Sequence, residues 1–320
     1  MKLALTAALL LHVAWLVAAQ DVLKDASPHR QEFVSVDDST RLEVLDWGGT
    51  GRSLVFLSGI GDTAHVFDTF APRFSNRFRV IGITRRGFGA SSRPLSGYTV
   101  PRLAKDIEVV LDALHIHEPV LIGHSIAGEE MSYIAARKSI RLGGLVYLEA
   151  AYDHTRPDAL IKVVVPRNLQ PSPVDRASRD AYQAFWLRTR GFRWPDSELD
   201  QFETFGDPPP SVSAEILGSA LAPEYGNVTA PALAIYVEPR SVRDLFPAYD
   251  DYGPTVRPEL DAAWPKWTAA VERDRRRFRR EVRHGEAVAV AARSHYLFLS
   301  NDQEVASLVD RFLQKSAWRR

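Results

Sequence analysis

Short apolar runs that alternate with amphipathic helical segments constrain the fold of this chain more than any other feature of its sequence. The runs at residues 54–57, 80–83 and 119–122 have the length of strands, and glycine or arginine follows each within two residues. Between the last two, residues 100–114 carry apolar side chains at helical spacing. Strands that are apolar throughout are typical of parallel sheets buried by helices on both faces. The sequence therefore predicts the α/β class with a mostly parallel central sheet.

The same order continues along the chain, with one long interruption. Further strands are predicted at 32–36, 42–45, 144–148, 232–237 and 287–292, and further helices at 125–138, 259–283 and 302–316. From about residue 154 to 228 the chain is rich in Pro, Trp and Arg and shows no strand pattern. Helical patterns near 178–189 and 211–221 indicate that this segment is a helical lid inserted into the main domain.

The first nineteen residues have the pattern of a secretory signal peptide. Lys2 precedes the apolar run 3–17, and the small residues Ala18 and Ala19 follow it. The run is short for a membrane span, and no second run is long enough to cross a bilayer. We therefore expect cleavage after Ala19, a mature chain of residues 20–320, and a secreted or periplasmic location.

Composition excludes several classes of function. The 40 basic and 40 acidic side chains balance to a formal net charge of zero, which gives no support for a nucleic-acid partner. The chain has no cysteine, so disulfides, thiolate catalysis and cysteine-ligated metals are excluded. The expected partner is a small-molecule substrate. The sequence implies no cofactor or metal and leaves the oligomeric state open.

The sequence GHSIAG at residues 123–128 is the strongest catalytic signal in the chain. It lies between a predicted buried strand and a predicted helix, where a sharp turn exposes a nucleophilic serine at the edge of a sheet. Small neighbours let the strand and the helix approach each other, although Ala127 stands where a second glycine is usual. Free N–H groups at the start of the helix can stabilise negative charge. We predict that Ser125 is the nucleophile.

A serine hydroxyl needs a base to take its proton. His295 follows the last predicted strand, which fits a base that comes last in chain order. We interpret His124, next to the serine, as a pocket-lining or packing residue. His29 lies near the mature terminus. The remaining histidines of the mature chain fit surface or lid positions: His65, His115, His117, His154 and His284.

The carboxylate that orients and stabilises the imidazole has several candidates. Glu149 directly follows the strand at 144–148, and two small residues come after it. Glu238 and Asp244 follow the next strand, and Asp153 is a further alternative. We favour Glu149 because it ends its strand directly.

The oxyanion of an acyl-transfer reaction needs two aimed backbone N–H groups. One is expected from Ile126, directly after the nucleophile. The other is expected from the loop Ser58-Gly59-Ile60-Gly61-Asp62, most readily from Ile60. The glycines of this loop let the backbone come close to a substrate.

These motifs resemble those of the α/β-hydrolase superfamily from about residue 32 to the C-terminus. Ser58-Gly59-Ile60-Gly61 resembles the family's His-Gly-x-x oxyanion loop, with Ser58 in place of histidine, and RGFGAS at 86–91 resembles its Arg-Gly-x-Gly-x-Ser loop. Longer strings at 61–67, 84–89, 123–130 and 295–301 resemble little-characterised secreted bacterial members with a serine nucleophile. The resemblance implies the α/β-hydrolase fold and a serine, histidine and acid triad.

The strand end Tyr147-Leu148-Glu149-Ala150 also resembles the acid position of some haloalkane dehalogenases. Those enzymes use an aspartate nucleophile, so Ser125 implies an acyl-enzyme instead. The expected activity is hydrolysis of a carboxylic ester of a small to medium, partly apolar substrate. A C–C hydrolase or a haloperoxidase-like enzyme has the same motifs, and a low-turnover binding protein is an alternative of another class. Lid aromatics either line the pocket or pack within the lid: Tyr182, Phe185, Trp186, Phe192 and Trp194.

Overall fold

The computed structural model describes residues 29–156, 169–292 and 294–315 of the 320-residue chain. The predicted signal peptide lies outside these ranges. Within them, no helix combines the length and the apolar character that crossing a bilayer requires.

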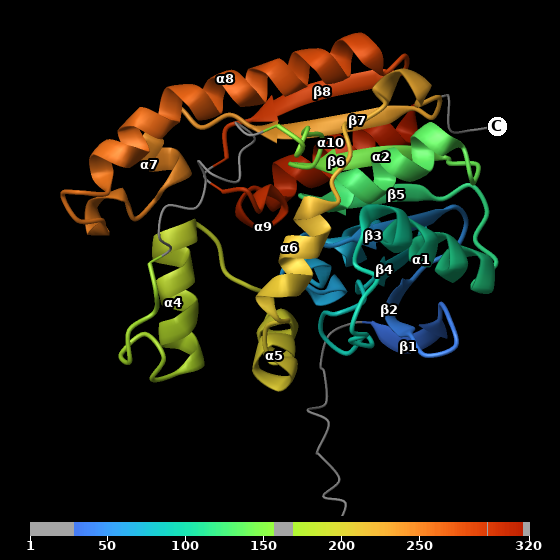
Figure 1. Cartoon of the computed structure of the whole chain (residues 1–320), viewed down its shortest axis with the longest axis horizontal. Helices are drawn as coiled ribbons and strands as arrows, with labels where there is room; N and C mark the ends of the chain where they lie inside the picture. The colour runs from blue at the N-terminus through green and yellow to red at the C-terminus, as the bar shows by residue number, and fades with distance from the viewer. Residues whose placement is uncertain (1–28, 157–168, 293, 316–320) are drawn as a thin grey trace, which may run out of the picture.

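In the described residues, eight strands form one sheet in the order β1-β2-β4-β3-β5-β6-β7-β8 (Figure 1). They are β1 (Arg30–Ser35), β2 (Arg41–Gly48), β3 (Ser53–Leu57), β4 (Arg79–Ile83), β5 (Val120–His124), β6 (Gly144–Leu148), β7 (Ala232–Val237) and β8 (Gly285–Val290). β2 runs antiparallel to β1 and to β4, and all other neighbours are parallel. The mostly parallel sheet is confirmed, although β8 begins and ends two residues earlier than predicted.

Side chains of the parallel strands alternate between two apolar cores, one on each face of the sheet. In β5, Leu121 belongs to one core, and Val120 and Ile122 belong to the other. The first core is covered by α1 (Val100–Ala113), α2 (Ala127–Arg137) and α8 (Arg257–Glu281). The second is covered by the 3₁₀ helices η1 (Ala64–Phe67) and η2 (Ala71–Phe74), with α9 (Leu297–Ser300) and α10 (Asp302–Gln314). Burial on both faces explains why these strands are apolar throughout.

Between β6 and β7 the chain leaves the sheet and forms α4 (Arg179–Arg190), α5 (Asp196–Phe205) and α6 (Pro210–Gly218). These helices lie outside the layers that flank the sheet (Figure 1). The sequence predicted α4 and α6 to within a few residues but missed α5, which has few apolar positions. The predicted lid, 154–228, includes residues 157–168 outside the described ranges, so its limits stay a prediction.

Candidate active site

Ser125 occupies the tight turn between β5 and α2. Its φ of 55° lies in the left-handed region, where residues other than glycine are uncommon. A Cβ atom on Gly128 would lie 1.8 Å from the backbone oxygen of Ala150, and one on Gly123 would lie 2.2 Å from a methionine sulfur of α2. Glycine at both positions therefore lets α2 approach the sheet. Ala127, between them, is fully buried and fits as alanine.

Glu149 and His295 meet at the carboxyl edge of the sheet. Glu149 follows β6 directly and also has a left-handed φ, 51°. His295 Nδ1 lies 3.2 Å from Glu149 Oε2. The other oxygen, Oε1, accepts hydrogen bonds of 2.6 Å from the Tyr152 hydroxyl and from the Val237 N–H. Because an ionised carboxylate only accepts hydrogen bonds, the proton of a neutral His295 lies on Nδ1, and Nε2 keeps its lone pair.

The other carboxylates considered from the sequence have different partners. Glu238 is exposed and pairs with an arginine of α8 at 3.3 Å. Asp244 accepts a hydrogen bond from the backbone N–H four residues before it. Asp153 pairs with another arginine of α8 at 2.7 Å. Of these four acids, the structure brings Glu149 to His295, and its catalytic role stays a prediction.

A cavity of about 220 Å³ opens beside Ser125, and His295 and Glu149 line it as well. Within the described residues, Ser125 Oγ has no hydrogen-bond partner. Much of the wall is apolar. It is formed by Ile60, Ile126, Leu217, Leu245 and Trp267.

The lid aromatics pack against one another rather than along this wall. Trp186 makes edge-to-face contacts with Tyr182, Phe185 and Trp194. Phe192 and Trp194 in turn pack against Tyr296, the residue after His295. The packing alternative therefore holds for this group, and of the three helices in this segment it is α6 that reaches the apolar wall, through Leu217.

The backbone of the loop after β3 comes close to Ser125. A Cβ atom on Gly59 would lie 2.9 Å from His124 Nδ1 and 3.3 Å from Ser125 Cβ. The N–H groups of Ile60 and Ile126 find no acceptor within the described part of the chain, so both remain available to a substrate oxygen. Ile126 is also the N-cap of α2, which adds the favourable end of the helix dipole.

Arg85 fixes this loop through hydrogen bonds to its backbone. Its guanidinium donates hydrogen bonds of 3.0 Å to the backbone oxygens of Ser58 and Gly59, and it pairs with Glu130 of α2 at 2.7 Å. All these groups are buried around one arginine, which fixes the loop to α2, the helix that begins two residues after Ser125. Arg85 lies in the string 84–89 that resembles family members, but no sequence pattern indicated its role.

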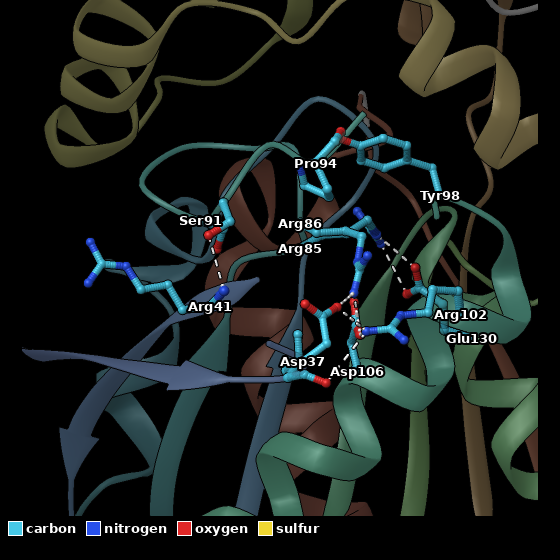
Figure 2. A network of polar contacts seen from close by, with 12 residues as sticks. Asp37, Arg41, Arg85, Arg86, Ser91, Pro94, Tyr98, Arg102, Asp106 and Glu130 are labelled. Carbon is cyan, nitrogen blue, oxygen red and sulfur yellow. Dashed lines mark hydrogen bonds and ion pairs between the residues drawn. The ribbon is translucent and has the colours of Figure 1, made fainter. Parts of the chain in front are cut away.

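A second arginine network lies next to Arg85 (Figure 2). Arg86 makes a two-point pair with Asp106 of α1, at 2.5 and 2.7 Å. Asp37 accepts hydrogen bonds from Arg86 at 3.3 Å and from Arg102 at 2.6 Å. Planar two-point pairs of this kind fix orientation as well as distance. They fasten the loop after β4 to α1.

His124 contacts the backbone of His295 through its ring. Its Nε2 donates to the backbone oxygen of His295 at 3.1 Å. Burial and the neighbouring His295 hold the pKa of His124 well below its usual value, so its ring is neutral. Its other nitrogen, Nδ1, faces the carboxylate of Asp62 at 3.8 Å. The pocket-lining interpretation is consistent with these contacts.

Two buried acids, Asp62 at the end of the loop after β3 and Glu198 next to it, had no signal in the sequence. Burial raises the pKa of Asp62 to about 7, although a hydrogen bond from the Tyr296 hydroxyl acts to lower it. Burial and the charge of Asp62 raise the pKa of Glu198 well above its usual value. Glu198 belongs to α5 and accepts a hydrogen bond of 2.8 Å from the Thr63 N–H. The segment between β6 and β7 therefore contacts the chain just after this loop through a buried carboxyl group.

Two histidines are more buried than the sequence predicted. His65 is 1% exposed because η1 turns it toward Glu43 of β2, and His154 lines the cavity with its ring against Glu129 at 2.8 Å. His115, His117 and His284 are exposed, as expected.

Comparison with known proteins identifies one family model, described as the α/β-hydrolase fold, which matches residues 52–185. A protein of Mycobacterium phage D29, whose name places it among non-heme haloperoxidases, is 31% identical over 51% of this chain and 60% of its own length. A non-heme chloroperoxidase of Streptomyces lividans is 33% identical over 40% of this chain and 49% of its own. A 2-(acetamidomethylene)succinate hydrolase of Mesorhizobium japonicum is 36% identical over 28% of this chain and 32% of its own. The chain thus spans less than two thirds of each of these relatives.

Solved structures share the fold over nearly the whole chain. The E-2-(acetamidomethylene)succinate hydrolase structure has a TM-score of 0.61 and 20% identity, covering 90% of this chain and 100% of that one. An esterase from Exiguobacterium antarcticum has a TM-score of 0.62 and 15% identity, covering 89% and 100%. At these identities the likeness concerns the fold.

We predict that Asp62→Asn gains stability relative to the wild type as pH rises. An aspartate whose pKa is near 3.9 unfolded and about 7 folded binds its proton more tightly in the folded state. Its contribution to stability is therefore lost as pH rises toward and through 7. Asparagine stays neutral, so the Tm difference, variant minus wild type, should be more positive at pH 8 than at pH 5.5. The exposed Asp38→Asn is the matched control, and an equal difference at both pH values would contradict the assignment.

Proposed function

We propose that this chain, which belongs to the α/β-hydrolase superfamily, is a serine hydrolase that cleaves carboxylic esters through an acyl-enzyme. The observation that carries the proposal is the 3.2 Å contact of His295 Nδ1 with Glu149 Oε2, in the cavity that Ser125 also lines. Ser125 follows β5, Glu149 follows β6 and His295 follows β8, so all three lie at one edge of the sheet. The chain order of serine, acid and histidine is the one typical of this fold.

In the proposed reaction, Ser125 Oγ attacks the ester carbonyl while His295 Nε2 takes the hydroxyl proton. The resulting oxyanion accepts hydrogen bonds from the Ile60 and Ile126 N–H groups. His295 then gives its proton to the leaving alcohol, and an acyl-serine remains. Water, deprotonated by the same nitrogen, attacks the acyl-serine, and His295 returns the proton to Ser125 Oγ as the carboxylic acid leaves. Glu149 stabilises the imidazolium in both halves of the reaction.

The cavity supports a small to medium, partly apolar substrate. About 220 Å³ is below the range usual for sites of drug-sized ligands. Its apolar wall suits an acyl or alcohol group of a few carbons, and its polar groups lie at the nucleophile end. We therefore expect short-chain p-nitrophenyl esters to be hydrolysed faster than long-chain ones.

A haloperoxidase-like reaction is the second candidate, because two of the relatives carry haloperoxidase names. At this site a carboxylic acid such as acetic acid would form the acyl-serine with loss of water. Hydrogen peroxide in place of water would then release the acyl group as a peroxy acid, which oxidises bromide. Peroxide- and bromide-dependent bromination of a dye in acetate buffer tests it. A C–C bond hydrolase would show neither activity on simple substrates, and a binding protein of this fold would show no turnover at all.

Ser125→Ala should reduce p-nitrophenyl ester hydrolysis by on the order of a thousandfold or more, because removal of a triad nucleophile has this effect in other serine enzymes. The exposed serine at the end of α2, Ser139, gives a matched control, and Ser139→Ala should keep wild-type rates. Circular dichroism and Tm establish that both variants fold. Full turnover in Ser125→Ala would disprove the nucleophile assignment.

Glu149→Gln should also lose on the order of a thousandfold in kcat. An amide can donate to His295 Nδ1 and hold the wrong tautomer, and it cannot stabilise the imidazolium. Glu238→Gln and Asp244→Asn should stay within about twofold of the wild type, because neither side chain contacts the base. If steady-state kinetics gave the opposite ranking, the catalytic acid would be assigned to the loop after β7 instead of Glu149.

We also propose that the protein is exported and that its mature chain begins at Gln20, as the signal-like N-terminus indicates. Intact-mass analysis of protein secreted by its native host should give the mass of residues 20–320. Recovery of the exported protein with residues 1–19 attached would refute the cleavage site.

A further inference from the structure

A buried cluster of His29, His65 and Asp68 lies apart from the catalytic cavity. One nitrogen of each histidine and one carboxylate oxygen lie within 4.8 Å of one another. His29 Nδ1 is 2.8 Å from Asp68 Oδ1, and His65 Nδ1 is 3.3 Å from Asp68 Oδ2. The three side chains are 3%, 1% and 4% exposed. None of them lines the cavity beside Ser125.

The local sequence and fold bring these donors together. His65 lies on η1 and Asp68 caps its C-terminus, and side chains three residues apart on a 3₁₀ helix share one face. His29 immediately precedes β1 and reaches the same face, with its ring centroid 4.9 Å from that of His65.

The cluster has an excess of buried negative charge that needs a counter-charge. Besides Asp68, the carboxylate of Glu43 is fully buried, with Oε1 3.2 Å from His65 Nε2. His65 therefore has a carboxylate at each ring nitrogen, and a neutral imidazole can donate to only one of them. Two protons shared by the histidines, or one divalent cation, would balance the pair of carboxylates. Buried charges in proteins are paired or bound to metals.

We propose that His29 Nδ1, His65 Nδ1 and an oxygen of Asp68 bind one zinc ion. Two imidazoles and a carboxylate are a usual donor set for zinc. The surrounding contacts are those that orient metal ligands, because a ligating histidine commonly donates its second N–H to a carboxylate. Here His65 Nε2 donates to Glu43. Asp68 in turn accepts hydrogen bonds from Trp47 Nε1 at 2.7 Å and from Ser197 Oγ at 2.5 Å.

The site is structural and independent of the proposed ester hydrolysis. The site connects His29, which precedes β1, with η1. Through the hydrogen bonds of Asp68 it also connects Trp47 of β2 and Ser197 of α5. Since η1 directly follows the loop that carries Ile60, zinc bound here would stiffen both that loop and its contact with the lid.

The test uses the full mature protein without an affinity tag, dialysed against chelator and then titrated with Zn²⁺. Calorimetry should give about one zinc per chain, and Tm should rise by roughly 5 °C at a hundredfold excess over Kd. His29→Asn keeps a donor at the Nδ1 position but loses the ligand, so its zinc affinity should fall at least a hundredfold. His117→Asn removes an exposed histidine and should bind zinc like the wild type.

Equal zinc affinity in wild type and His29→Asn would overturn the proposal and assign the zinc to surface groups. Absence of zinc binding by the wild type would also overturn it and leave the cluster as a hydrogen-bonded network with protonated histidines. This wild-type measurement decides the matter even if His29→Asn does not fold.

Discussion

The left-handed turn at Ser125 is the constraint from which the rest of the site follows. A side chain in this backbone conformation is tolerated when the surrounding structure holds it in place. Here β5 enters from a fully buried sheet and α2 leaves with its glycine against the backbone at Ala150. The same turn places the Ile126 N–H at the start of a helix and points the serine out of the sheet. Glu149, at the end of the neighbouring strand β6, has the same left-handed backbone conformation, with a nearly equal φ.

Buried ion pairs hold the loops that surround this turn. The loop after β3 is fixed through the backbone oxygens that Arg85 contacts, and the charge of the arginine is balanced by Glu130. The neighbouring loop is fixed by Arg86 and Asp106 (Figure 2). Such pairs add little net stability because desolvation is costly, but removal of one partner leaves a buried charge. Their contribution is therefore geometric: they fix the loops after β3 and β4, and in the proposed reaction the first of these loops supplies the Ile60 N–H.

Sequence patterns predicted those parts of the molecule that depend on local periodicity. The strands of the central sheet, the helix α1 and the turn at Ser125 follow from apolar runs and small residues. The partner of His295 could be ranked but not decided, because Glu149 and Glu238 both end strands that lie side by side. The burial of His65, the helix α5 and the acids Asp62 and Glu198 were missed. Each depends on contacts between segments far apart in the chain, which local patterns do not encode.

A reactive Ser125 is the premise on which the proposed chemistry depends, and covalent labelling addresses it without knowledge of the natural substrate. A fluorophosphonate reacts efficiently with a serine only when a base activates it and an oxyanion hole receives the phosphoryl oxygen. Peptide mapping by mass spectrometry after labelling of the folded wild type should find one adduct, on Ser125. An adduct on another residue, or an unmodified Ser125 in protein that hydrolyses esters, would contradict the account.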